Sequence, residues 1–215
     1  MKNAANKKTI IDEYNPLTIE DGHGALSDEE KEEAITYYFK KIMETLGLDL
    51  SDDSLQNTPA RVAKMYVKEV FSGLDPNAFP AISLFRNTYQ YSEMLLEKNI
   101  EVFSYCEHHF VPFMGKAHIA YMPGEMVIGL SKLNRIVKYF ARRPQVQERL
   151  TRDIADSLKK ILQTEDIAVV IEAKHLCVAA RGVEDTCSAT STSYFGGRFN
   201  TADNKASFFN ALRQK

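Results

Sequence analysis

The sequence lacks a surplus of charge of either sign, a paired set of cysteines and any long apolar run. Its 27 Lys and Arg residues nearly balance 29 Asp and Glu residues, which gives a formal net charge of −2 at pH 7. This balance gives no general signal for binding polyanions such as nucleic acid, so a phosphate ligand would need a local basic pocket. The three cysteines are a poor disulfide framework, and reduced thiols or metal ligands in a cytosolic protein fit them better.

No segment reads as a secretory signal or a membrane span. The N-terminus has no apolar core of the kind that signal peptides carry. The longest apolar run, near Ile167–Ile171, is far too short to cross a bilayer. We therefore expect a cytoplasmic protein that contacts no membrane. A chain of 215 residues that is 44% hydrophobic is long enough for one sizeable domain with a real core.

The first third of the chain predicts a small helical unit behind a polar arm. Residues 1–26 are polar and show no period, so we expect a flexible arm there. The helical unit is placed at residues 27–80. Its first helix begins at an S-x-x-E capping box formed by Ser27 and Glu30, and Pro59 lies in the first turn of the second. The two helices are expected over residues 28–46 and 58–72.

Residues 81–215 read as strands, two helices, strands again and a short amphipathic C-terminal helix. Ser131 is well placed to cap the first of the two central helices, and a Pro123-Gly124 turn should make the strand that follows it the return partner of the strand before it. This order predicts an α+β fold with an antiparallel sheet packed on paired helices. The strands are expected over 100–105, 116–121, 126–130, 167–180 and 188–194, and the helices over 132–141 and 146–163.

Two short clusters of Cys and His carry the clearest chemical signal. Cys106 and His109 have the C-x-x-H spacing that lets one tight turn present a thiolate and an imidazole to one ion. His175 and Cys177 stand two residues apart in an expected strand, so their side chains should point to the same side. Two thiolates and one imidazole favour zinc, and three protein ligands leave a fourth position open, as in catalytic sites.

Other interpretations of these residues stay open at this point. A lone cysteine is more often a small buried hydrophobe, and a lone histidine is more often a hydrogen-bonded residue. A structural zinc module for protein interaction predicts a fourth protein ligand, for which Cys187 or His175 would be candidates; otherwise Cys187 is expected to be a packed thiol. A zinc nucleoside deaminase is disfavoured because its H-x-E and P-C-x-x-C signature is absent from the sequence.

The histidines should divide between metal binding and proton transfer. His108 and His109 are adjacent and point in opposite directions in extended backbone, so they should not both bind one ion easily. His109 has the turn spacing from Cys106, which leaves His108 for hydrogen bonding or proton transfer. His175 stands beside the expected metal as a candidate general acid.

Basic and acidic residues near these clusters suit an anionic ligand. Lys132 and Arg135 lie on one face at the positive end of a helix, which favours an anion such as phosphate. Arg181 follows Cys177 by four residues and so brings a guanidinium close to the metal. Glu148 begins a helix, where a carboxylate commonly compensates the helix dipole, but a buried carboxylate would also bind the edge of guanine. The sequence leaves both open.

Arg142 and Arg143 are expected to be surface charges.

Four motifs in order along the chain resemble the GTP cyclohydrolase I family, and the resemblance extends from about Asp49 to near Gly197. The motifs are Cys106–His109, Gly129–Arg135, Arg143–Leu150 and His175–Gly182. The resemblance implies the tunnelling fold, in which subunits join their sheets into a barrel, and a homodecamer of two pentameric rings with sites at subunit interfaces. It implies hydrolysis of GTP at purine C8 with release of formate, then rearrangement and ring closure to 7,8-dihydroneopterin triphosphate, the first step of pterin and folate biosynthesis.

The resemblance also implies roles for individual residues. One zinc ion per subunit would be held by Cys106, His109 and Cys177. Proton transfer and positioning would fall to His108, His175 and Ser131. The guanine edge would be bound by Glu148 with help from Gln147, and the triphosphate by Lys132, Arg135 and Arg181, with Arg61 contributed by a neighbouring subunit.

Overall fold

The computed structural model describes residues 26–214. The arm expected at residues 1–26 therefore lies almost wholly outside the described residues. Within the described part, none of the helices combines the length and the apolar character that crossing a membrane requires.

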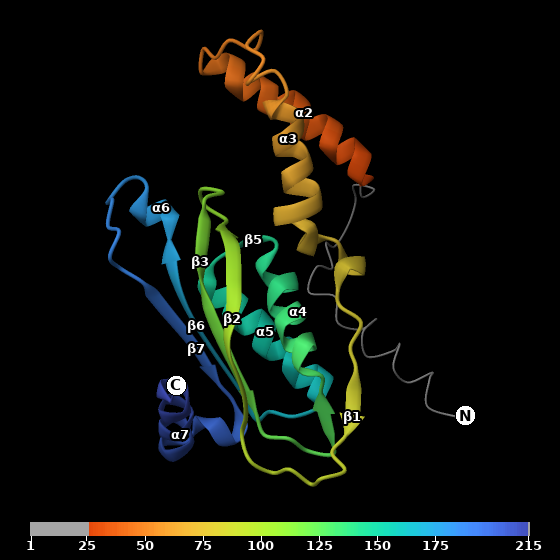
Figure 1. Ribbon diagram of the computed structural model, residues 1–215, viewed down its shortest axis with the longest axis vertical. Helices are drawn as coiled ribbons and strands as arrows, with labels where there is room; N and C mark the ends of the chain where they lie inside the picture. Colours follow the sequence, from red (N-terminus) through yellow and green to blue (C-terminus); the bar gives the residue numbers. More distant parts are fainter. Residues whose placement is uncertain (1–25, 215) are drawn as a thin grey trace, which may run out of the picture.

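The N-terminal helical unit projects from one end of the chain's main body (Figure 1). Its first helix, α2 (Asp28–Thr45), begins at the expected capping box, in which the side chain of each box residue accepts from the backbone amide of the other. α3 (Thr58–Lys64) packs against α2 and continues as a π-helical turn, η1 (Met65–Val70). Two 3-10 turns then lead into the main body, η2 (Ser72–Leu74) and η3 (Pro76–Ala78).

The main body is built on one five-stranded sheet. β2 pairs antiparallel with β3, β3 with β6 and β6 with β7, whereas the short β5 runs parallel to the end of β2. In their order across the sheet, the strands are β5 (Pro144–Gln145), β2 (Leu95–Cys106), β3 (Pro112–Tyr121), β6 (Ile167–His175) and β7 (Thr190–Phe195).

The strand that follows the Pro123-Gly124 turn does not return along β3, so that expectation was wrong. Both edges of β3 are already occupied, by β2 on one side and β6 on the other. The chain therefore leaves the sheet, and β4 (Met126–Ile128) pairs instead with β1 (Leu84–Arg86) in a separate two-stranded ribbon.

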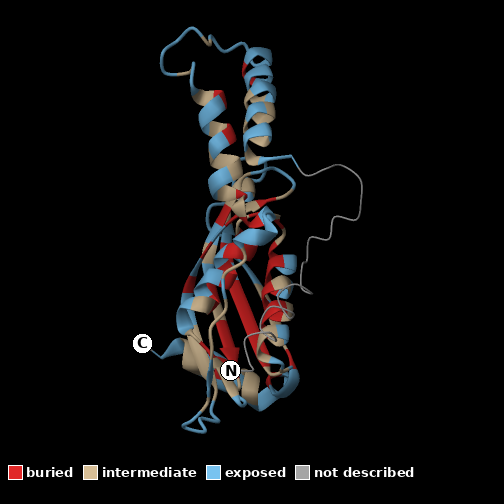
Figure 2. Ribbon diagram, turned by 90° about the vertical axis from the view of Figure 1, so that its right-hand side faces the viewer, coloured by how far each residue is buried: buried red, intermediate tan, exposed pale blue. Residues whose placement is uncertain are grey.

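Two long helices cover one face of the sheet, α4 (Leu130–Ala141) and α5 (Gln147–Leu162). Alternate strand residues such as Val102, Ile119 and Val169 point into the core beneath them, which forms the buried centre in Figure 2. Ser131 is not the cap of α4. The helix begins at Leu130, two residues earlier than expected, with Gly129 in extended backbone at the cap position, so Ser131 lies exposed in the first turn.

Within residues 26–214, the opposite face of the sheet is covered only at one end. There η4 (Gly197–Asn200) and α7 (Ala202–Arg213) lie over Ala120, Ala168 and Val170, with Phe199 and Phe208 buried between them. Toward the other end of the same face Phe103 is 48% exposed. Helices thus lie on both faces of one mixed, mostly antiparallel sheet, which confirms the expected α+β class.

The expectation that Arg143 is a surface charge was wrong. Arg143 is buried and joins the helical unit to the main body. It is 4% exposed, its guanidinium lies 4.7 Å from the ring centre of Tyr139, and it donates a 2.8 Å hydrogen bond to the carbonyl of Gly73. Gly73 donates in turn to the carbonyl of Arg142. A Cβ on Gly73 would stand 2.1 Å from the carbonyl oxygen of Tyr139, so this close approach of two backbones requires glycine.

Candidate metal centre and active site

The turn between β2 and β3 presents the first two candidate metal ligands. Cys106 is the last residue of β2; its amide donates to the carbonyl of Val111 at 2.9 Å, and its own carbonyl accepts from Phe110 at 2.8 Å. Phe110 takes a left-handed conformation (φ 54°) that closes the turn. His108 and His109 lie within it, so the C-x-x-H spacing produces the tight turn that we predicted.

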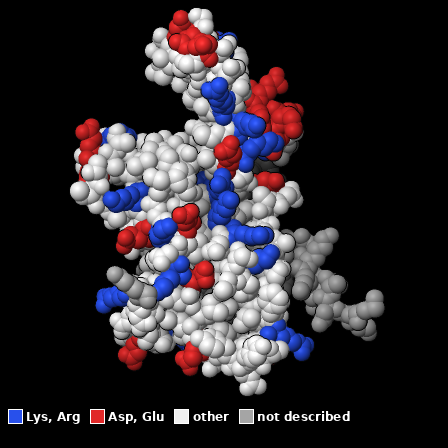
Figure 3. Space-filling view, viewed as in Figure 1, with Lys and Arg blue, Asp and Glu red and all other residues white. Residues whose placement is uncertain are grey.

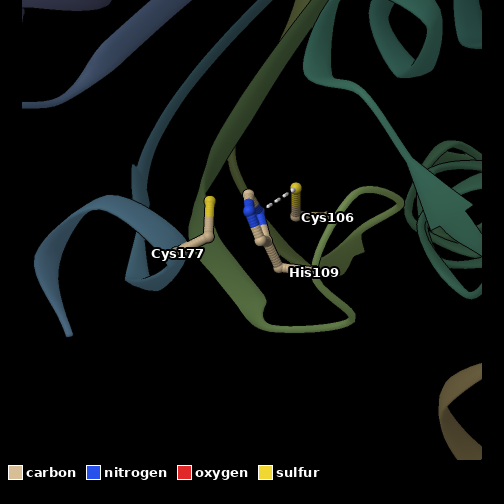
Figure 4. Close-up of side chains that lie close together, drawn as sticks. All are labelled: Cys106, His109 and Cys177. Carbon is tan, nitrogen blue, oxygen red and sulfur yellow. Dashed lines mark hydrogen bonds between the residues drawn. The ribbon is translucent and has the colours of Figure 1, made fainter. Parts of the chain in front are cut away.

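The third candidate ligand reaches the same place by a different route from the one expected. β6 ends at His175, and the next residues form a single helical turn, α6 (Leu176–Ala179). The strand predicted to continue to residue 180 is therefore wrong beyond His175, and Cys177 does not share a strand face with that residue. Cys177 nevertheless lies beside the β2–β3 turn (Figure 4).

Cys106, His109 and Cys177 form a compact three-residue cluster. Their ligand atoms all lie within 4.8 Å of one another, and Cys106 Sγ is 3.9 Å from His109 Nδ1. Zn–S bonds of about 2.3 Å and Zn–N bonds of about 2.0 Å place tetrahedral ligand atoms roughly 3.5–3.8 Å apart. The spacing of the three ligand atoms therefore suits a small ion, provided that the ligands move slightly closer together when they bind it.

The electrostatics of the cluster also favour a cation. Cys106 is buried and Cys177 half-buried. Burial, followed by the neighbouring Cys106, raises the pKa of the Cys177 thiol. Two adjacent thiols of this kind resist ionising together, and a divalent cation removes that penalty because it binds both as thiolates. The donor set therefore fits a metal ion, and among the described residues the cluster contains no fourth protein ligand.

Two further predicted site residues lie directly against the cluster. Nδ1 of His108 is 3.6 Å from Cys106 Sγ, and the His108 side chain is 62% exposed. Arg181 NH1 lies 3.1 Å from His109 Nε2. His108 is therefore available for proton exchange with solvent or a ligand, and Arg181 brings a positive charge to the open side of the cluster.

His175 and the first turn of α5 form the wall beside the cluster. The His175 ring stacks on Phe113 with the ring centres 4.7 Å apart, and its Nε2 lies 2.8 Å from Gln147 Oε1. Burial lowers the pKa of His175, and the nearby Glu148 carboxylate opposes that shift. Glu148 is exposed, so it is free to bind a ligand.

The other predicted substrate residues lie elsewhere in the chain. Ser131, Lys132 and Arg135 are in the first half of α4, which begins beside β4 and ends beside β5 (Figure 1). Arg61 is exposed on α3 in the projecting helical unit. Among the described residues, no hydrogen bond or ion pair joins these four residues to the cluster.

Sequence reasoning missed the residues that hold the metal-bearing turn in place. Glu107, inside the turn, forms an ion pair with Arg149. Arg149 also donates to the carbonyl of Pro144 at 3.0 Å and to Gln145 Oε1 at 2.8 Å. No local pattern signals this network, because Glu107 and Arg149 are 42 residues apart. Cys187, expected to be a packed thiol, is exposed in the loop after α6.

The curled sheet on paired helices, with a Cys-His-Cys cluster at its end, defines an α+β protein with a cluster that could hold a metal ion. The GTP cyclohydrolase I family model matches residues 35–213. The chain is 55% identical over 188 residues to a GTP cyclohydrolase 1 of Flavobacterium johnsoniae, an alignment that covers 87% of this chain and 84% of that protein. It is 53% identical over 190 residues to a GTP cyclohydrolase 1 of Aeromonas salmonicida, covering 88% and 87%.

The chain belongs to the GTP cyclohydrolase I family and is an enzyme of the tunnelling fold. The family resemblance and the α+β fold expected from the sequence are thereby confirmed.

Replacing Cys177 with Ser should abolish tight metal binding, because two ligands cannot hold the ion as three do. We expect the zinc affinity of C177S to fall more than about 100-fold, beyond what loss of an outer-shell partner costs. Competition with a chromophoric chelator measures this affinity. The matched control is Cys187→Ser, which removes an exposed thiol outside the cluster and should leave the affinity unchanged; equal losses in both variants would contradict the assignment.

Replacing Arg149 with Met should weaken metal binding without removing a ligand. The turn that carries Cys106 and His109 loses its ion pair, and we expect a loss of about 10-fold in zinc affinity. Arg152→Met is the matched control, since Arg152 lies on the same helix in an exposed pair with Asp156. An affinity for R149M equal to that of R152M would show that the network does not hold the metal-bearing turn.

Proposed function

We propose that this enzyme hydrolyses GTP at purine C8, releases formate and closes the ring to 7,8-dihydroneopterin triphosphate, with one zinc ion per chain. The observation that carries the proposal is the three-ligand cluster beside His175 and Glu148, in a chain of this family. A metal site with an open position needs a substrate group next to it, and the purine would occupy the space between the cluster and the first turn of α5.

Zinc is the metal that this donor set suits best. Two thiolates with one imidazole are soft ligands, and they favour zinc over magnesium or calcium. When bound, zinc lowers the pKa of a coordinated water and so supplies a nucleophile near neutral pH.

The chain's own residues would bind the substrate and move its protons. Glu148 would accept hydrogen bonds from N1–H and the exocyclic amine of guanine. His175 would protonate N7 as water adds to C8, since its half-buried ring is held in one orientation by stacking on Phe113 and by Gln147. His108, exposed beside Cys106, would serve later proton transfers with Ser131. Arg181 would bind the triphosphate.

The remaining cations would come from a neighbouring copy of the chain. Lys132 lies nine residues before the end of α4, which is about 14 Å along the helix axis. Cys106 pairs with β5, which begins only after α4 ends, so Lys132 is at the end of α4 that is farther from Cys106. Figure 3 shows Lys and Arg side chains gathered on the face that α4 lines. In a ring, Ser131, Lys132 and Arg135 of one chain would face the metal cluster of another.

Surfaces without a partner in the described chain support such an assembly. β7 lies at one edge of the sheet, and the other edge is covered only by the two-residue β5, so both edges can join a neighbour's sheet. On α2, Tyr38, Ile42 and Leu46 form an exposed apolar stripe at helical spacing. Edge-to-edge pairing would close a heterologous ring, and the α2 stripe would join two rings. We therefore propose the decamer of two pentamers, in the cytoplasm.

Incubating the zinc-loaded protein with GTP tests the reaction directly. We expect formate and a product that becomes fluorescent as oxidised neopterin. Protein treated with a chelator should give neither, and added zinc should restore both. Zinc-loaded protein of confirmed metal content that forms no formate would sink the proposal.

Mixing two inactive variants tests whether the site is shared between chains. C177A lacks a metal ligand and R135A lacks a phosphate ligand, so each alone should be nearly inactive. Random assembly of the two would leave about a quarter of the interfaces with both residues intact, and activity should recover accordingly. No recovery in mixed oligomers isolated through two different tags would contradict a shared site.

A further inference from the structure

The contacts of Gln147 determine which of its two amide atoms is which. One terminal atom lies 3.0 Å from the carbonyl of Ile171 and 3.0 Å from the carbonyl of Thr190. Carbonyl oxygens only accept hydrogen bonds, so this atom must be the donor, Nε2. If the amide were flipped, Oε1 of Gln147 would face the carbonyl oxygens of Ile171 and Thr190 with no hydrogen between them. Water could not relieve this repulsion, because Gln147 is only 1% exposed.

The remaining atom is therefore the oxygen, and it determines the proton position on His175. Gln147 Oε1 lies 2.8 Å from His175 Nε2. An amide oxygen can only accept, so His175 Nε2 must carry hydrogen and donate it. In the neutral ring Nδ1 then holds the free electron pair, and Nδ1 is the nitrogen left to exchange a proton.

Two threonines complete the hydrogen-bond network of Gln147, and their contacts allow only one assignment of donors and acceptors. Thr151 Oγ1 donates its hydrogen to the carbonyl of Gln147 at 2.9 Å. Thr192 Oγ1 lies 2.7 Å from Thr151 Oγ1 and must be the donor there, because Thr151 has used its hydrogen. Thr192 Oγ1 is then left as an acceptor 3.1 Å from Gln147 Nε2, which shares its two hydrogens among this oxygen and the carbonyls of Ile171 and Thr190. The donors of Gln147 are all engaged, and the side chain is closed off from a ligand.

We propose that Gln147 is a positioning residue that holds His175 in its Nε2–H form, rather than a residue that binds guanine. This inference rests on the proposed function. It reverses the expectation that Gln147 assists Glu148 and leaves guanine recognition to Glu148. In the proton transfer, the Nδ1–H bond of the charged ring breaks and an N7–H bond forms on the purine. The electron pair of the broken bond stays on Nδ1, and the ring returns to the neutral Nε2–H form.

The two roles predict different kinetics for Gln147→Met, which keeps the length of the side chain but removes its hydrogen bonds. A positioning role predicts a fall in kcat on the order of 10²-fold, with little change in KM and unchanged preference for GTP over inosine triphosphate, which lacks the exocyclic amine. Glu148→Gln, in contrast, should reduce that preference. Loss of the preference in Q147M with kcat retained would overturn the proposal.

A control and an independent measurement separate this role from a loss of structure. Arg152 lies on the same helix outside this network, in an exposed pair with Asp156, so the kcat of Arg152→Met should stay within about threefold of wild type, well short of the loss expected for general acid catalysis. Neutron diffraction from wild-type crystals should show deuterium on His175 Nε2 facing Gln147 Oε1; an unprotonated Nε2 would refute the proposal. That observation needs no turnover, so its failure is distinct from failure of the GTP reaction.

Discussion

The site depends on a two-residue parallel pairing between β2 and β5. Cys106 lies opposite Gln145, and the amide of Glu107 donates to the Gln145 carbonyl at 3.0 Å. Two residues after Gln145 the chain enters α5, so the helix start that carries Gln147 and Glu148 must lie beside the turn that carries the metal ligands. Without this pairing, the turn that carries Cys106 and His109 and the helix start that carries Gln147 and Glu148 would be separate surface features.

The second constraint is the position at which β6 ends. Its antiparallel register with β3 sets His175 opposite Phe113, and β6 stops there. Because the strand stops, the chain turns and brings Cys177 toward Cys106 instead of leaving it on the sheet face. One strand end thus supplies both a stacked, half-buried imidazole and a candidate metal ligand. A bound divalent ion would offset the cost of placing two thiols together.

Local patterns predicted the parts of the structure that are local. The capping box of α2, the apolar periods of α4 and α5, and the turn from Cys106 to His109 depend on residues a few positions apart, and all are found. Cys177 lies beside Cys106 and His109 as expected, but on a helical turn and not on a strand, since nothing nearby in sequence marks the end of β6. The burial of Arg143 was missed because its acceptor on Gly73 is 70 residues away. The Gln147 network spans up to 45 residues and is equally invisible to a local pattern.

The residues proposed to move protons and those proposed to bind the triphosphate have opposite requirements for burial. The His175 ring is held by stacking on Phe113 and by its hydrogen bond to Gln147, contacts that fix the orientation a proton donor needs. The triphosphate, in contrast, needs several hydrated cations, and burying these in one chain without the substrate would be costly. In the proposed assembly, lysine and arginine side chains on α4 would avoid that cost until a neighbour's cluster and the substrate lay opposite them. Such a divided site would make catalysis depend on assembly, because neither half alone could both hold GTP and open its ring.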